Sequence, residues 1–118
     1  MRILIDSDIL VDHLRGHNRF DPGDDEIYVS SITRSELFSG RATDETRVIR
    51  LLEAMQELSV DRAVAERAGR IRRETNVRLP DALIAATAIE NGLALVTRNR
   101  RDFEAIPGLV LRESGLSS

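Results

Sequence analysis

The chain has 118 residues, enough for one domain built around one hydrophobic core. Its hydrophobic fraction of 42% and charged fraction of 31% exclude a disordered protein, and its net charge of −3 argues against a protein that coats nucleic acid through a basic surface. The absence of cysteine excludes disulfides, zinc–thiolate sites and thiol nucleophiles, and all 17 basic residues are arginine, which excludes mechanisms that need lysine. No apolar run approaches the ~18 residues of a membrane span, so we expect no membrane association and a cytoplasmic location.

The first half of the chain alternates short apolar runs with helical patterns. Its predicted strands are residues 2–5 and 27–30, and its predicted helices are residues 9–14 and a segment containing residues 35–38. Residues 17–26 contain Pro22, Gly23 and several Asp, so they predict a loop. An amphipathic helix is predicted next, because apolar residues recur at helical spacing at Val48, Leu51, Leu52, Met55 and Leu58.

The second half continues this alternation. Residues 58–60 are a strand candidate, and Asp61 is a plausible N-cap of the following helix. Pro80 fits the first turn of the next helix, which is apolar nearly all round over residues 82–89 and is therefore expected to be buried, with Gly92 just past its end. The last predicted elements are a strand at 93–96, a short helix around 100–105 and a strand at 109–111.

This alternation of strands and helices predicts an α/β fold, with a parallel sheet covered by helices on both faces. We expect one domain over residues 1–113 and a flexible tail over residues 114–118. No repeat or linker divides the chain.

Four acidic residues are expected at one edge of this sheet, because chemistry in open parallel sheets gathers beyond the carboxyl ends of the strands. Asp6 directly follows the first strand, and Glu36 lies in the helix after the second. Asp81 lies in the first turn of the buried helix, and Asp102 comes a few residues after the fourth apolar run. Each acid alone also has an ordinary structural explanation, such as a helix first-turn charge or an ion pair, so the prediction rests on the four together.

Clustered carboxylates repel one another unless a cation compensates them. With no lysine and no nearby histidine, a divalent ion with a preference for oxygen ligands, Mg²⁺ or Mn²⁺, is the expected partner. Such an ion suits phosphodiester hydrolysis.

At these residues the sequence resembles the PIN-domain family, and in size and motifs most closely the VapC-type toxins of toxin–antitoxin pairs. The resemblance is carried by four stretches, at residues 4–10, 30–37, 79–88 and 96–103. It implies a sheet of about five parallel strands, Mg²⁺-dependent endonucleolytic RNA cleavage, a homodimer and neutralisation by a small VapB-type antitoxin. It also implies that Asp6 and Asp81 are the principal metal ligands, that Glu36 supports the metal or its water, and that Ser7 and Thr97 orient the site.

Two positions depart from the family pattern. Asp8 stands where the family usually has Asn, and is either a fifth acid or a helix N-cap; we expect the capping role. Asn99 stands where many members have Asp, so the fourth site position lies between Asp102 directly and Asn99 as a neutral ligand or water holder.

RNA contact is expected from arginines near the same edge, although each one is also explained as an ordinary solvent-exposed charge on a helix. These candidates are Arg34, Arg41, Arg98, Arg100 and Arg101. The helix predicted over Val48–Leu58 and its neighbour are expected mainly to form part of the core. They are also candidates for lining a groove that binds the antitoxin.

Three other functions compete with a nuclease. Phosphatases of the haloacid dehalogenase type and response-regulator receiver domains share the α/β pattern with N-terminal acids, but both need a lysine that this chain lacks. The remaining alternative is a catalytically silent PIN-like module for binding or dimerisation. The presence of all the main acids favours an active enzyme.

Overall fold

The computed structural model describes residues 1–113; the tail predicted at 114–118 lies outside the described residues. Five strands form one sheet, namely β1 (Arg2–Ile5), β2 (Glu26–Ser30), β3 (Gln56–Leu58), β4 (Ala94–Val96) and β5 (Leu111–Arg112). The helices are α1 (Ser7–Leu14), α2 (Ser31–Phe38), α3 (Glu45–Glu53), α4 (Arg62–Glu74), α5 (Leu79–Glu90) and α6 (Arg100–Phe103).

All strand pairs are parallel, in the order β3-β2-β1-β4-β5. The chain therefore winds outward from the central strand β1 in one direction to β3, then returns to the other side of β1 for β4 and β5. The order reverses beside β1, and the carboxyl ends of β1 and β4 flank this switch point, where α/β sheets build their sites. The predicted α/β class and five-stranded parallel sheet are confirmed.

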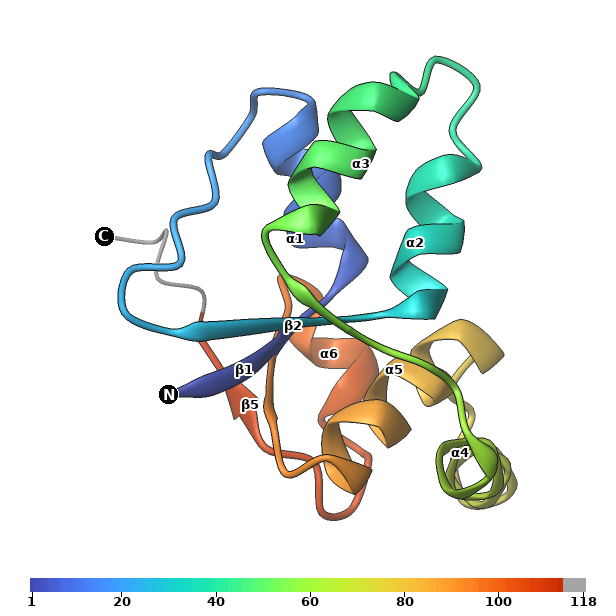
Figure 1. The fold of residues 1–118 in the computed structure, drawn as a ribbon. Coiled ribbons are helices and arrows are strands. Elements are labelled where there is room, and N and C mark those ends of the chain that lie inside the picture. Colours follow the sequence, from blue (N-terminus) through green and yellow to red (C-terminus); the bar gives the residue numbers. More distant parts are fainter. Residues whose placement is uncertain (114–118) are drawn as a thin grey trace.

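Helices cover both faces of the sheet, with α1 and α3 on one side and α4, α5 and α6 on the other (Figure 1). Successive strand residues point to opposite faces, so the strands contribute side chains to two hydrophobic cores, one on each face of the sheet. Leu4 and Leu95 pack with the core beneath α4 and α5, whereas Ile5, Val29 and Val96 pack with the core beneath α1 and α3.

Helix α5 is the buried helix, as predicted. Six of its twelve residues are buried, and four of these are alanine, which leaves room for close packing of α4. Asp61 caps α4 by accepting from Val64 N, and Pro80 lies in the first turn of α5. Gly92 follows α5 with a φ of 64°, a left-handed conformation that favours glycine.

Three predicted elements have other bounds in the structure. The helix predicted over Val48–Leu58 ends at Glu53, and Gln56–Leu58 forms β3 instead of the strand predicted at 58–60. Met55 and Leu58 fit helical spacing, but here they pack into the two different cores, as residues three apart do along an extended chain. The final strand is Leu111–Arg112 and not 109–111, because register against β4 pairs Leu95 with Leu111.

None of the helices in residues 1–113 is long and apolar enough to cross a membrane.

Candidate active site

Asp6 stands where β1 passes into α1, and the backbone holds it there. Its N–H donates to Val96 O at 2.9 Å, which extends the β1–β4 pairing beyond the end of β1. Its carboxylate accepts from Ser7 N at 2.8 Å and from the Thr97 hydroxyl at 2.7 Å. Only 6% of Asp6 is exposed, so this carboxylate is held in one orientation in a largely dehydrated place.

Asp6, and not Asp8, is the N-cap of α1. The residue has extended backbone geometry and its side chain accepts from the first N–H of the helix, while Asp8 lies inside the first turn. The capping role predicted for Asp8 was therefore wrong. Its side chain instead reaches Thr97 and the backbone N–H of Arg98, at 3.2–3.4 Å.

Ser7, the first residue of α1, contacts Glu36 on α2. The Ser7 hydroxyl donates to the Glu36 carboxylate, and its oxygen lies 3.0 Å from the hydroxyl of Thr33. Thr33 is fully buried and lies three residues before Glu36, on the same side of α2. We did not predict Thr33 from the sequence; its place in helical spacing with Glu36 was the available signal. The structure thus brings Ser7 to Glu36.

Asp81 completes a group of mutually repelling acids. It lies half-buried in the first turn of α5. Burial raises its pKa, and the charges of Asp102, Glu36 and Asp8 raise it further, while Arg78 opposes them. Asp102 on α6 receives a hydrogen bond from the Asn99 side-chain amide. The structure therefore brings together all four acids that we predicted, with Asn99 beside Asp102.

Asp6 has the most displaced pKa in this group. Its pKa is raised from the ordinary value of 3.8 to about 7, mainly by burial, then by the charge of Asp8 and to a smaller extent by that of Asp81. The hydrogen bonds from Thr97 and Ser7 act in the opposite direction but are outweighed. A carboxylate in this position is stabilised in its charged form only if a cation comes close.

The donors of this site are carboxylate oxygens, the hard ligands that Mg²⁺ and Mn²⁺ prefer. As the side chains stand, no three His, Asp or Glu residues within 1–113 enclose a position for a metal ion. Mg²⁺ usually binds through one or two carboxylates and keeps several waters, so it needs no preformed protein cage. The chemistry and the mutual repulsion of the acids fit such an ion.

The arginines predicted to contact RNA differ in their surroundings. Arg34 pairs with Glu57 at 2.7 Å, and Arg98 pairs with Asp12 of α1. Arg100 lies 3.8 Å from Glu113, and both side chains are well exposed. Arg101 is exposed and makes no ion pair within residues 1–113.

Comparisons with known proteins identify the family of this chain. The family model of the PIN domain matches residues 3–109. The chain is 38% identical over 109 residues to Ribonuclease VapC10 of Mycobacterium tuberculosis, covering 82% of each chain. It is 33% identical over 113 residues to the tRNA(fMet)-specific endonuclease VapC of Salmonella typhimurium, covering 86% of this chain and 84% of that one.

A solved toxin–antitoxin complex from Klebsiella pneumoniae contains a chain that superposes with a TM-score of 0.77 at 34% identity, covering 92% of this chain and 95% of that one. Similarity therefore extends over most of the sequence. It includes each segment that carries an acid of the site. The chain belongs to the PIN-domain family and, within it, to the VapC group.

Proposed function

We propose that this protein is a metal-dependent endoribonuclease, the toxin of a VapBC-type pair, and that Asp6, Asp81, Glu36 and Asp102 form its active site. One observation carries the proposal: Asp6 is buried among other acids, which raise its pKa to about 7 together with burial. Such a cluster lowers the stability of the folded protein, so folding does not explain its presence. Carboxylates with perturbed pKa values in this arrangement are characteristic of functional sites. The names of the two curated relatives support RNA as the substrate.

The four acids would hold Mg²⁺, for which Mn²⁺ is a substitute. When bound, the ion supplies a Lewis acid for the phosphoryl oxygen and lowers the pKa of a coordinated water. Asp6 and Asp81 lie deepest and act as the principal ligands. Ser7 fixes the orientation of Glu36, and Thr97 fixes that of Asp6.

Asn99 and Asp102 share the fourth position in different roles. The Asn99 amide donates to the Asp102 carboxylate, which leaves Asp102 the charged group and Asn99 the residue that orients it. The charge of Asp102 raises the pKa of Asp81, which supports a role for Asp102 beside Asp81. We therefore assign the fourth acidic role to Asp102.

RNA binds along the same edge of the sheet. Arg100 and Arg101, at the start of α6, are exposed next to Asp102 and suit phosphate contact. Arg34 and Arg98 already have carboxylate partners and are weaker candidates. Arg41 lies in a groove near α3 that Glu36 also lines.

That groove is the proposed seat of the antitoxin. It has a volume of about 440 Å³ and lies among α1, α2 and α3. Apolar side chains of Val11, Leu14 and Val48 line it together with Arg41 and Arg47. An antitoxin segment with apolar anchors and acidic groups fits this lining. We also propose a homodimer in the cytoplasm, as the family resemblance implies.

The nuclease proposal is tested by incubating the purified protein with a pool of single-stranded RNA, either in Mg²⁺ or in EDTA. We expect cleavage only with Mg²⁺, and background activity in Asp6→Asn and Asp81→Asn, which keep side-chain size but remove charge. Arg70→Gln, on an exposed part of α4, is the matched control and retains activity. Equal activity in the Asp variants overturns the site, and no cleavage by the wild type favours the silent binding module.

A further inference from the structure

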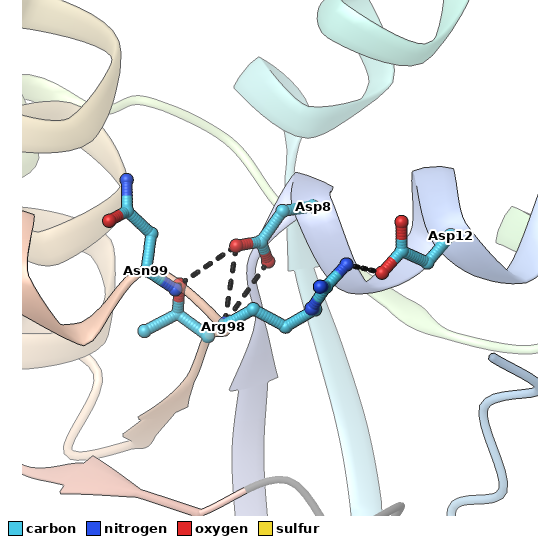
Figure 2. Close-up of polar contacts among 5 residues, drawn as sticks. Asp8, Asp12, Arg98 and Asn99 are labelled. Atoms are coloured by element: carbon cyan, nitrogen blue, oxygen red, sulfur yellow. Dashed lines mark hydrogen bonds and ion pairs between the residues drawn. The ribbon is translucent and has the colours of Figure 1, made fainter. Parts of the chain in front are cut away.

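Two acids on α1 face the loop that follows β4. Asp8 and Asp12 are one helical turn apart, and Figure 2 shows both directed toward Arg98. The Asp8 carboxylate accepts from the backbone N–H of Arg98, at 3.2 and 3.4 Å to its two oxygens. The guanidinium of the same residue pairs with Asp12. Helix α1 thus holds both the backbone and the side chain of Arg98.

The pair between Asp12 and Arg98 is unequal in burial. The Asp12 side chain is 11% exposed, whereas the Arg98 side chain is 53% exposed. Within residues 1–113, the Arg98 guanidinium is the one ion-pair partner of the buried Asp12 Oδ2, and no other donor reaches this oxygen. If Arg98 turned away to bind a phosphate, a nearly buried carboxylate would remain without compensation, which is strongly unfavourable. We therefore expect the Arg98 guanidinium to remain paired with Asp12.

The loop that Arg98 anchors carries two contacts of the candidate site. Thr97, just before Arg98, donates to Asp6 at 2.7 Å. Asn99, just after it, donates its N–H to the Thr97 hydroxyl at 3.0 Å and its side-chain amide to Asp102. A displacement of Arg98 would move both neighbours, and with them the orientation of two carboxylates that approach Asp81 from different elements.

We propose that Asp8, Asp12 and Arg98 form a clamp between α1 and the β4–α6 loop, and that this clamp positions Thr97 and Asn99 against the acids of the site. Arg98 is then a positioning residue and not an RNA contact. This inference deepens the proposed function and rests on it for its effect on catalysis, but the clamp itself is testable without any nuclease activity.

The two roles of Arg98 make opposite predictions for Asp12→Asn. If Arg98 binds RNA, removing the Asp12 charge frees the guanidinium and lowers KM for RNA. If Arg98 is a positioning residue, the loop loosens, kcat falls and KM stays near the wild-type value, because contacts to the RNA are unchanged. Small misplacements of catalytic groups cost up to about a hundredfold in rate, so we expect a fall in kcat of roughly tenfold to a hundredfold.

The kinetic experiment compares Asp12→Asn, Arg98→Gln and the double variant with wild type, over a range of salt concentrations. We expect similar losses of kcat in all three, because each breaks the same clamp and the effects are not additive. The salt dependence of KM should stay unchanged in Arg98→Gln, whereas Arg101→Gln reduces its logarithmic slope by about 0.7, the loss of one contact to single-stranded RNA. Arg70→Gln is again the neutral control. A reduced salt slope and raised KM in Arg98→Gln, or a lowered KM in Asp12→Asn, would overturn the proposal.

Amide hydrogen exchange tests the clamp apart from catalysis. The Arg98 N–H is protected by Asp8, so Asp8→Ala should accelerate its exchange by about tenfold or more, and Asp8→Asn, which keeps an acceptor oxygen, by less. Asp12→Asn should also accelerate exchange at Arg98 and Asn99, but not in β1. Arg98→Lys keeps a positive charge near Asp12 and provides a folded variant if Arg98→Gln is unstable; it should restore part of kcat. Exchange at Arg98 that is unchanged in Asp12→Asn refutes the clamp even if the nuclease proposal holds.

Discussion

Asp6→Asn should make the metal-free protein more stable at neutral pH while it abolishes catalysis. Asp6 is 6% exposed and its pKa in the folded protein is about 7, against an ordinary value of 3.8. Between these two values the unfolded chain has released the proton and the folded protein retains it, so the free energy of unfolding falls as pH rises. Below pH ~4 both states are protonated and the penalty is absent.

The displacement from 3.8 to about 7 corresponds to roughly 4 kcal/mol above pH 7, an upper limit because hydration and structural relaxation reduce it. Asn cannot ionise, and its amide still offers an acceptor to Ser7 N and a donor to the Thr97 oxygen. We therefore expect Asp6→Asn to be about as stable as wild type near pH 4 and more stable by about 1–4 kcal/mol at pH 8.

Urea denaturation followed by circular dichroism, in EDTA at pH 4, 6 and 8, measures this difference. The exposed-loop substitution Asp24→Asn is the matched control and should show no growing difference with pH. A gap between Asp6→Asn and wild type that is constant with pH, or a less stable variant at pH 8, would refute the argument that burial and neighbouring acids destabilise the charged Asp6.

Three further outcomes follow from the structure. Mg²⁺ should raise the thermal midpoint of wild type more at pH 8 than at pH 5.5, because ligands must be deprotonated, and should have little effect on Asp81→Asn in the same thermal scan. Ser7→Ala removes the donor to Glu36, so steady-state kinetics should show a kcat lowered by about tenfold to a hundredfold with an unchanged KM; a raised KM alone would contradict this role. Leu52→Ala, in the core beneath α3, should lower the free energy of unfolding by about 2–5 kcal/mol in urea while kcat at low temperature is kept.

Local sequence patterns were sufficient to predict the class of the fold and the residue types of the candidate site. Short apolar runs alternate with helical patterns, and this alternation is a local property that each segment carries alone. It was enough to predict a parallel sheet, the buried helix α5 and the acids that follow the strands. The absence of lysine excluded competing chemistries without any structure.

Which residues contact one another depends on the tertiary structure. Met55 and Leu58 satisfied helical spacing, yet pairing of Gln56–Leu58 with β2 formed a strand there and placed the two side chains in different cores. Asp8 looked like a cap, yet its partner is a backbone N–H ninety positions away, at Arg98. Hydrogen bonds between β1, α1 and the β4 loop depend on the strand order, which sets β4 beside β1. Local patterns do not encode that order, because it results from how all the apolar faces are buried together.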